Sequence, residues 1–470
     1  MAQIASTKGG DYANTSVPLD ERRGPLTMGL LWITMVTAFP SVLIGFEWFK
    51  NGITLPQVLT CASISCLILL VYSIPATQLG ARSGLSYTTL SRSIFGRWGS
   101  GLISINLIWM FICFYGLTAL FMAEGLVGLF HWTIPIALLT AIVALLMSVN
   151  NFFGFKGVAN FARFVAAPVM IVWVAYTFCK AVSHCPADVL SQTPHQPFAL
   201  ALTSVSSFII GYAVWGNELD YWRFSRPKVL DSTIPLVAAL VLGQIIFPVA
   251  GWMVARISGV TEYGAATALM NDYSFGGITI LAAVVLGATY FACNDSNLFG
   301  SLQACENLKE MSHRKWAIIL AVLGAICGAL LSILGAAKSI EAIASLNCVI
   351  LPTPTVIMMA EWLLLLKVFK SGIQISDLRV PSFDELPPLR MSAVIALISG
   401  IAIGLLTAGV IPGLEKFNVG ISSLQAWLTA LFIYMPLRIA EYKRELVAQR
   451  AQLELSLANA RGPEVHGLIR

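Results

Sequence analysis

Carboxylates, aromatic rings and glycines occur together in the stretch "GYAVWGNELDYWRFSRP", residues 211–227. Glu218 and Asp220 directly follow a long uncharged run, and carboxylates at such places in a membrane are costly and usually functional. Arg223 lies three residues after Asp220, so this carboxylate is expected to form an ion pair on a helix surface. Glu218 has no such partner nearby in the sequence. It is the first candidate for a group that takes up and releases a proton.

A second polar stretch, "LGATYFACNDSNLFGSLQACEN", interrupts an otherwise apolar run at residues 286–307. Thr289, Cys293 and Asn297 recur every four residues, so they share one face of a helix. Polar groups this numerous on a membrane helix favour a cavity over simple packing between helices. The polar side chains are Thr289, Cys293, Asn294, Asp295, Ser296 and Asn297. Asp295 is the second candidate for a proton carrier.

Aromatic side chains accompany both features. Phe111, Phe114 and Tyr115 fall in the middle of one apolar run, and Tyr212 and Trp215 fall near the end of another. Aromatic rings stack on one another and on flat ligands. Beside amide and hydroxyl groups they could sandwich a flat heterocycle, with the polar groups reading its edge.

The composition shows what kind of element must hold these residues. Of the 470 residues, 57% are hydrophobic and 11% are charged, whereas about 25% are charged in a soluble domain. About 20 apolar residues form a helix that crosses a bilayer. Runs of this kind, uncharged or interrupted by one charge, predict an all-α protein with twelve spans. They are residues 25–46, 51–81, 98–123, 125–155, 158–179, 189–217, 232–255, 273–294, 316–337, 342–366, 391–414 and 417–437.

The distribution of positive charge predicts the orientation. With the N-terminus inside, 24 of the 29 Lys and Arg residues fall on the cytoplasmic side, where such charges are retained. Residues 1–24 contain no apolar segment of a signal peptide and are expected to be a disordered cytoplasmic tail. Residues 25–440 form the predicted transmembrane domain. Residues 441–470 form a cytoplasmic tail, helical over 441–460. We therefore expect a multi-pass protein of the inner (plasma) membrane with both termini in the cytoplasm.

Breaks are predicted in the first and sixth spans. The first contains Pro40 and Gly45, and the sixth contains Gly211 and Gly216, at corresponding places five spans apart. This spacing favours an inverted repeat with two discontinuous helices, an architecture in which transporters bind substrate near the middle of the membrane. The alternative is two ordinary kinks, because Gly and Pro are common in membrane helices. A short interfacial helix is also expected over residues 260–274.

Several classes of function are disfavoured. The five histidines, which a metal site in the spans would need, all fall in or near predicted loops and tails. No nucleophile–base pair is readable, so neither an enzyme nor a cofactor is expected. The nine cysteines lack metal-binding spacing, and Cys179 and Cys185 are either free or joined in a disulfide. A net charge of +5 concentrated on one side does not indicate nucleic-acid binding. The expected partners are a small heterocyclic substrate and the lipid bilayer, and the oligomeric state stays open.

Four stretches together resemble a known family. They are "GARSGLSYTTLSRSIFG" at residues 80–96, "DYWRFSRP" at 220–227, the polar stretch at 286–307, and "ILPTPTVIMMAEWLL" at 350–364. In this order they resemble the bacterial purine–cytosine permeases of the nucleobase–cation symporter family. The resemblance covers roughly residues 20–440.

The resemblance implies a LeuT-type fold, in which spans 1–5 and 6–10 are inverted repeats and two further helices follow. It places substrate between spans 1, 3, 6 and 8. The stacking aromatic of span 3 corresponds to Phe114 and the amide of span 8 to Asn294. The second stacking position falls on Gly211, so Tyr212 or Trp215 would take over this role. Backbone contacts of span 1 fall near Phe39.

The expected coupling ion differs from that of the sodium-dependent members of the family. Their hydroxyl-bearing sodium ligands correspond to Thr289, Ala292 and Cys293, and a hard cation prefers oxygen ligands, which Ala292 and Cys293 lack. We therefore expect an importer of a nucleobase, cytosine or a purine by default, that works by alternating access and couples to H⁺ rather than Na⁺. The alternatives are a sodium-coupled carrier of allantoin, hydantoins or a vitamin precursor, and an amino-acid permease of the same fold.

Overall fold

The computed structural model describes residues 12, 15–37, 39–261, 263–309, 311–336, 340–369, 372, 374–379 and 381–460. Within this part every regular element is a helix, apart from one isolated β-bridge between Arg23 and Ser225. Seven helices or helix runs are long and apolar enough to cross a membrane, and the bent pair α1 and α2 makes an eighth. The all-helical class and the multi-pass character predicted from the sequence are therefore confirmed.

The helices follow one another with short connections. The first half of the chain contains α1 (Pro25–Val36), α2 (Phe39–Lys50), α3 (Leu55–Ser83), α4 (Tyr87–Phe130), α5 (Ile136–Met147), α6 (Gly154–Phe161), α7 (Ala167–His184), α8 (Phe198–Ala213) and α9 (Glu218–Trp222). The second half contains α10 (Val229–Leu240), α11 (Phe247–Ser258), α12 (Tyr263–Phe275), α13 (Thr279–Leu308), α14 (His313–Ile333), α15 (Ile340–Ile350), α16 (Pro352–Met359), α17 (Leu366–Phe369), α18 (Met391–Thr407) and α19 (Ser422–Ala460).

Three π-helical segments join consecutive helices: η3 (Ala162–Ala166), η5 (Val241–Ile246) and η7 (Ala360–Leu365). The 3₁₀ turns are η1 (Leu19–Glu21), η2 (Val149–Phe153), η4 (Ala187–Leu190), η8 (Ile375–Asp377), η9 (Phe383–Glu385) and η10 (Glu415–Phe417). We use span 1 for α1 with α2, span 6 for α8 with α9, and span 10 for α15 to α17 with η7.

Helices lie in every predicted range, but most predicted ends differ from those observed. The starts predicted at residues 98, 125 and 189 correspond to helices that begin at Tyr87, Ile136 and Phe198. The predicted end of a span at residue 123 falls inside α4, which continues to Phe130 and ends where His131 adopts a left-handed φ of 54°. The range 273–294 was also displaced, since α13 begins at Thr279 and runs to Leu308. Asp295 lies inside this helix because side chains of the α5–α6 connection provide its hydrogen bonds.

The N-terminal segment is folded where the sequence predicted disorder. Over residues 15–24 the chain packs on the turn between α3 and α4, where the Val17 amide donates to the Gly84 carbonyl at 3.0 Å. The Arg22 side chain is buried and donates to the carbonyls of Val17 and Ala81. The prediction of a disordered tail is therefore wrong for 15–24, because local polarity does not reveal these long-range partners. Residues 1–11, 13 and 14 lie outside the described part.

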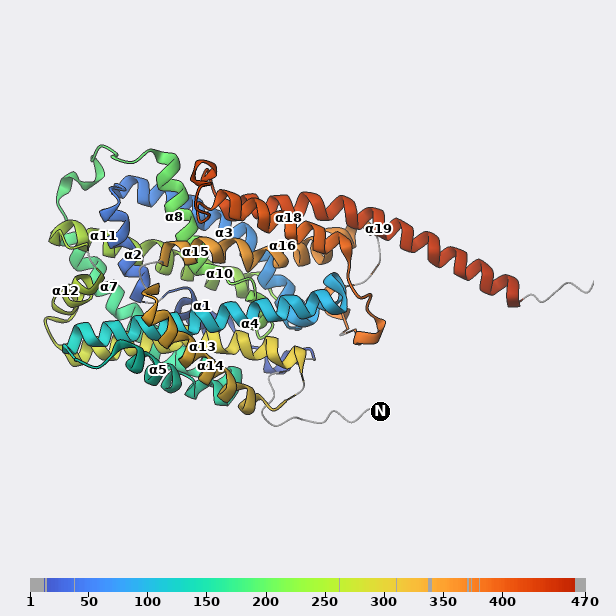
Figure 1. Ribbon diagram of the computed structural model, residues 1–470, viewed down its shortest axis with the longest axis horizontal. Helices are drawn as coiled ribbons and strands as arrows, with labels where there is room; N and C mark the ends of the chain where they lie inside the picture. The colour runs from blue at the N-terminus through green and yellow to red at the C-terminus, as the bar shows by residue number, and fades with distance from the viewer. Residues whose placement is uncertain are drawn as a thin grey trace, which may run out of the picture.

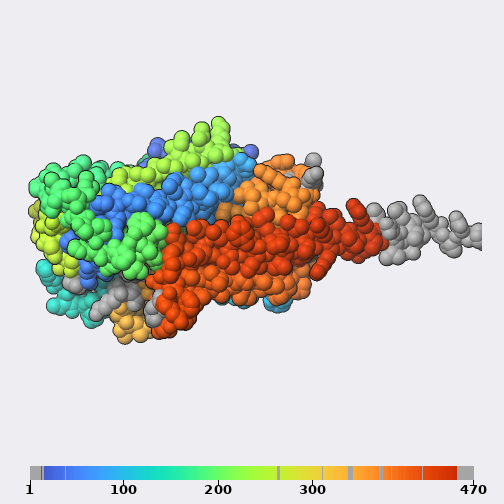
Figure 2. Space-filling view, turned by 90° about the horizontal axis from the view of Figure 1, so that it is seen from above, coloured from blue at the N-terminus to red at the C-terminus, as the bar shows by residue number. Residues whose placement is uncertain are grey.

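Other local predictions are confirmed. The short helix expected over 260–274 is α12, and the helix expected over 441–460 is the continuation of α19, whose C-terminal part extends beyond the bundle (Figures 1 and 2). Cys179 and Cys185 are both free thiols, which answers the question left open by the sequence. Residues 461–470 lie outside the described part.

Close packing brings the two broken spans to the centre of the bundle. Helix α13 lies along α4, α2 along α11, and α8 contacts both α3 and α15 (Figure 1). Where α2 crosses α11, a Cβ on Gly45 would lie 2.0 Å from the Pro248 carbonyl oxygen, and one on Gly251 would lie 1.8 Å from that of Val42. Small residues allow such backbone approach between membrane helices, so these glycines fix the position of span 1.

Candidate functional site

Span 1 is broken between α1 and α2, which meet at an angle of 46°. Thr37 has an extended backbone there, and Ala38 lies outside the described residues. The break frees the carbonyl of Val36, which accepts a hydrogen bond from the Gln244 side-chain amide of η5 at 2.5 Å. A freed carbonyl inside a membrane needs a partner within the protein, and Gln244 supplies it.

Span 6 is broken over residues 214–217, where Gly216 has a φ of 78°. The Glu218 carboxylate lies over this break and is fully buried. Its Oε1 accepts from the backbone amides of Trp215 at 2.8 Å and Gly216 at 3.1 Å, and its Oε2 accepts from the Tyr72 hydroxyl at 2.9 Å. The carboxylate therefore supplies hydrogen-bond partners to the amides that the break exposes.

Span 10 supplies donors for the carbonyls of the same break. The Asn347 side-chain amide donates to the carbonyls of Gly211 and Val214, and the Thr355 hydroxyl donates to that of Gly216. The backbones approach closely here, since a Cβ on Gly216 would lie 2.1 Å from the Leu351 carbonyl oxygen. The break in span 6 is thus stabilised by Glu218, which belongs to span 6 itself, and by Asn347 and Thr355 of span 10. The two breaks predicted from the glycines and the proline are confirmed.

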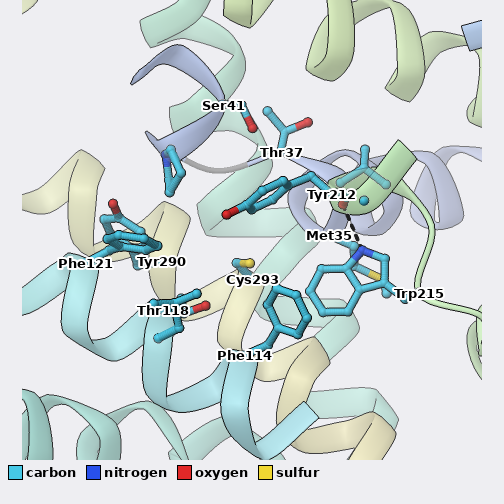
Figure 3. Close-up of a pocket in the computed structure, with 14 residues that line it drawn as sticks. Met35, Thr37, Ser41, Phe114, Thr118, Phe121, Tyr212, Trp215, Tyr290 and Cys293 are labelled. Carbon is cyan, nitrogen blue, oxygen red and sulfur yellow. Dashed lines mark hydrogen bonds between the residues drawn. The ribbon is translucent and has the colours of Figure 1, made fainter. Parts of the chain in front are cut away.

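A pocket lies between the two breaks and is closed by α4 and α13 (Figure 3). Its cavity volume is about 20 Å³, which is room for about one water molecule. A flat ring would need the pocket to widen. The lining residues are Met35, Val36, Thr37, Pro40, Ser41, Phe114, Leu117, Thr118, Phe121, Gly211, Tyr212, Trp215, Tyr290 and Cys293.

The aromatic rings of the pocket are backed by other rings. Trp215 stacks on Phe111 with centroids 5.4 Å apart and planes 16° apart, and it is tilted by 41° to Phe114. Tyr212 stacks on Phe208 at 4.5 Å and accepts a hydrogen bond on its backbone carbonyl from Nε1 of Trp215 at 2.9 Å. Figure 3 shows Tyr212 and Trp215 opposite Phe121 and Tyr290 across the pocket. The backing rings fix these orientations, as a stacking surface for a planar ligand requires.

Hydroxyl groups supply most of the polarity of the pocket. Thr37 and Ser41 come from span 1, Thr118 from α4 and Tyr290 from α13. The Thr37 hydroxyl has no hydrogen-bond partner among the residues that the structure describes. Sequence reasoning missed these four side chains. Two signals were present: Thr37 and Ser41 flank Pro40, and Thr118 lies four residues after Phe114, on the same helix face.

The predicted side chains divide into two groups. Phe114, Gly211, Tyr212, Trp215 and Cys293 line the pocket. The others lie behind its described lining. The Phe39 ring stacks on Trp173 at 5.4 Å, and the Asn294 amide donates to the Tyr115 carbonyl at 3.1 Å and to the Met147 sulfur at 3.0 Å. The Thr289 hydroxyl donates to the Leu286 carbonyl of its own helix at 3.0 Å.

The remaining carboxylates are buried and hydrogen-bonded. Asp295 accepts from the side-chain amides of Asn150 at 2.8 Å and Asn151 at 3.3 Å. Asp220 accepts from the Tyr87 backbone amide at 2.8 Å, at the first residue of α4, where the helix dipole favours a negative charge. Arg223, predicted to pair with this carboxylate, donates to the Asp220 backbone carbonyl at 3.2 Å, to Gln303 at 2.8 Å and to the Tyr12 carbonyl at 2.7 Å.

The arrangement suits reversible binding of a small flat molecule. It offers stacking surfaces, hydroxyl groups and the backbone of two interrupted helices. In the described part of the chain no group of three or more His, Cys, Asp or Glu side chains could hold a metal ion. The geometry thus offers a binding site within the bundle.

Comparisons with known sequences identify relatives. Residues 17–424 match the family described as permease for cytosine/purines, uracil, thiamine and allantoin. The cytosine permeases of Escherichia coli O157:H7 and of Escherichia coli strain K12 are each 25% identical to this chain over 332 residues, covering 67% of this chain and 74% of theirs.

Comparisons with solved structures agree with the fold. Mhp1, a nucleobase-cation-symport-1 family transporter in a closed conformation with bromovinylhydantoin bound, superposes with a TM-score of 0.71 at 17% identity, covering 92% of this chain and 96% of Mhp1. A sodium-coupled sialic acid symporter gives a TM-score of 0.59 at 12% identity, covering 88% of this chain and 89% of that protein. At these identities the likeness shows the fold alone, which agrees with the expected LeuT-type class.

The relatives are permeases, so at the level of the family they support a transporter rather than an enzyme. The match covers most of the chain, including both broken spans and the pocket between them. The chain therefore belongs to the family of permeases for cytosine/purines, uracil, thiamine and allantoin.

Proposed function

We propose that this protein is a secondary active importer of a nucleobase or a related small heterocycle, with cytosine or a purine as the first candidates. The observation that carries the proposal is the aromatic pocket between the two broken spans. A flat ring enters against the rings of Phe114, Tyr212 and Trp215, which face Phe121 and Tyr290 across the pocket. Family membership and the relatives named cytosine permease support this choice of substrate class.

The proposed architecture has twelve spans within residues 25–440, with spans 1–5 and 6–10 as inverted repeats and two helices appended. Both termini lie in the cytoplasm of a cell whose inner membrane holds the protein. Support comes from the equivalent breaks in spans 1 and 6 and from the charge distribution. Alternating access widens the pocket toward one side of the membrane at a time.

Within the pocket we assign stacking to Phe114, Tyr212 and Trp215, and backbone contacts to Gly211. Edge recognition is assigned to the hydroxyls of Thr37, Ser41 and Thr118 instead of the Asn294 amide, because that amide already donates to two groups behind the pocket. Phe39 has a supporting role through its stacking on Trp173.

We further propose that transport is coupled to H⁺. Ala292 packs with Ala166 and Ala288 in a small apolar cluster, which is a poor environment for a sodium ion. The neighbouring positions Thr289 and Cys293 offer a hydroxyl engaged within its own helix and a thiol. A proton carrier must be titratable, and both Glu218 and Asp295 are buried carboxylates in contact with transport spans. We propose one of these two as the carrier.

The substrate class is tested with purified protein by thermal-shift measurements against nucleobases, allantoin, hydantoins, thiamine and pyridoxine precursors, and amino acids, each with and without Na⁺. We expect stabilisation by a nucleobase without a requirement for Na⁺. Stabilisation by amino acids alone would overturn the substrate class. Stabilisation that depends on Na⁺ would overturn proton coupling and favour the sodium-coupled alternative.

The site is tested by Trp215→Leu, with Trp109→Leu as the matched control because Trp109 is exposed on the outer surface of α4. Stacking of a base on an aromatic ring contributes about 1–3 kcal/mol, so Trp215→Leu should weaken binding by roughly 5- to 150-fold. Equal effects of the two substitutions would contradict the assigned site.

The proton carrier is identified by Glu218→Gln and Asp295→Asn in proteoliposomes with an imposed pH gradient. The carrier's variant should still exchange substrate across the membrane but should no longer accumulate it in response to the gradient. If both variants accumulate substrate as the unaltered protein does, neither carboxylate is the carrier.

A further inference from the structure

An apolar groove opens on the outer surface of the bundle between α3, α19 and span 10. Figure 2 shows the surface of α3 in blue alongside that of α19 in red. The groove has a volume of about 500 Å³. At its mouth lie Leu67, Val71 and Leu364, with exposed fractions of 63%, 77% and 45%. Tyr72 and Trp427 form its floor.

The position of the groove along α3 places it in the interior of the bilayer. Leu67 lies twelve residues after the first residue of α3, Leu55, and Pro75 lies twenty residues after it. With a rise of about 1.5 Å per residue, the groove begins about 18 Å from one end of a helix that spans about 42 Å. The hydrocarbon core of a bilayer is about 30 Å thick. The mouth therefore faces acyl chains and not water.

The chemistry of the groove selects its occupant. Thirteen of its fourteen lining residues are apolar or tryptophan, and the remaining one, Tyr72, directs its hydroxyl away into the protein toward Glu218. The lining presents no charged side chain to a polar headgroup. A narrow, flexible hydrocarbon chain satisfies these conditions, and the groove is continuous with the lipid-facing surface formed by Leu67 and Val71.

The floor and one wall of the groove also hold the break in span 6. The Tyr72 ring stacks on Trp427 at 4.7 Å, and its hydroxyl donates to Glu218 at 2.9 Å. Val356 of span 10 lines the groove, and the adjacent Thr355 donates to the Gly216 carbonyl. A molecule bound in the groove would therefore contact Tyr72 and Val356, beside or among the groups that hydrogen-bond to the break in span 6.

We propose that this groove binds one acyl chain of a bilayer lipid, which packs on Tyr72 and Trp427 and supports the break in span 6 from behind. This site is distinct from the pocket between the broken spans and does not depend on which substrate that pocket takes. Bound lipid and detergent chains are the same hydrocarbon chemistry, so the experiment uses lipid with a chemically marked chain.

The protein is reconstituted in nanodiscs of dioleoylphosphatidylcholine or of the same lipid brominated in the middle of its chains, since bromine quenches tryptophan fluorescence on contact. The contribution of Trp427 is the difference between the unaltered protein and Trp427→Phe, which keeps an aromatic ring against Tyr72. We expect brominated chains to remove most of the Trp427 emission, although its side chain is 5% exposed.

A matched pair of variants tests whether the chain lies in the groove. Val71→Phe fills the mouth, while Val172→Phe makes the same change at an equally exposed position on α7, with exposed fractions of 77% and 70%. Val71→Phe should protect Trp427 from bromine, and Val172→Phe should not. Unquenched Trp427 in the unaltered protein, or equal quenching in both variants, would overturn the proposal. Unquenched Trp427 together with chemical cross-linking of two copies through Val71→Cys would assign the groove to a second copy instead.

Discussion

Spans 1 and 6 are both interrupted, yet their breaks are held in different ways. In span 6, Glu218, Asn347, Thr355 and Tyr72 all take part, and they engage both the amides and the carbonyls of the break. In span 1 the described contact to the freed backbone is the bond from Gln244 to Val36. Span 6 therefore forms a fixed wall of the pocket.

Span 1 brings to the pocket a hydroxyl, that of Thr37, with no hydrogen-bond partner among the described residues. This hydroxyl lies against Gly243 of η5. A buried hydroxyl without a hydrogen bond is unfavourable by about 1–3 kcal/mol, and a bound ligand can relieve that cost. Span 6 therefore supplies the shape of the pocket, and span 1 supplies a group that can hydrogen-bond to a ligand. Substitutions in span 6 should then affect stability first, and those in span 1 should affect affinity first.

The largest effect is expected for Gly216→Ala. The new Cβ would lie 2.1 Å from the Leu351 carbonyl oxygen, and the backbone φ of 78° is unfavourable for alanine. The control is Gly259→Ala, which has a φ of 72° and nothing within 4 Å of its new Cβ. The control should cost about 1–2 kcal/mol from the backbone alone. Gly216→Ala should lower the thermal unfolding midpoint much further and abolish uptake. Similar midpoints for the two variants would mean that span 10 does not hold the break.

The next largest effect is expected for Glu218→Ala. Two buried amides and the Tyr72 hydroxyl lose their acceptor. Each unsatisfied group costs about 1–3 kcal/mol, so the variant should lose roughly 3–9 kcal/mol of unfolding free energy in total. Glu218→Gln keeps one carbonyl oxygen for the amides of Trp215 and Gly216 and should retain most of the stability. Denaturant unfolding in detergent measures both. A Gln variant as unstable as the Ala variant would show that the negative charge stabilises the break, and not the hydrogen bonds to the amides of Trp215 and Gly216.

A direct comparison of the two breaks comes from Asn347→Ala and Gln244→Ala. Asn347 serves two carbonyls of span 6, and Gln244 serves the Val36 carbonyl of span 1. Each variant leaves buried acceptors unsatisfied at about 1–3 kcal/mol per group, and Asn347→Ala should be the less stable of the two. The same unfolding measurement decides this. A larger loss of unfolding free energy for Gln244→Ala would mean that span 1, and not span 6, is the more rigidly held of the two.

The sequence predicted those parts of the site that depend on local chemistry. Pro40 and Gly216 mark the breaks, because proline removes a backbone donor of a helix and Gly216 adopts a φ of 78°. Gly45 and Gly211 lie within α2 and α8 and instead allow close approach of a neighbouring backbone. Phe114 and Trp215 could be nominated because aromatic rings at mid-span depth, beside polar groups, can stack on a flat ligand.

Long-range partners could not be predicted in the same way. Glu218 seemed to lack a partner because two of its donors are backbone amides, of Trp215 and Gly216, and the third, the Tyr72 hydroxyl, lies 146 residues away in the sequence. Asn294 was nominated for the pocket, but its helix is rotated so that the amide reaches Tyr115 and Met147 instead. The rotation of α13 is set by its packing against α4, which no pattern within α13 encodes.

The smallest effect on stability is expected for Thr37→Val. This variant also distinguishes most clearly the role of span 1 in affinity from the role of span 6 in stability. Valine has nearly the shape of threonine, and the hydroxyl that it removes has no partner in the described part of the chain. Removing an unsatisfied buried group should leave the unfolding free energy unchanged or slightly raised. The control is Thr177→Val, which removes a hydroxyl bonded to the Trp173 carbonyl at 2.8 Å and should lower stability by about 1 kcal/mol. Substrate affinity should fall in Thr37→Val and stay unchanged in Thr177→Val, because Thr37 lines the pocket and Thr177 does not belong to its described lining. Titration of substrate against each variant measures this order, and unchanged affinity in Thr37→Val would remove span 1 hydroxyls from the recognition of the ligand's edge.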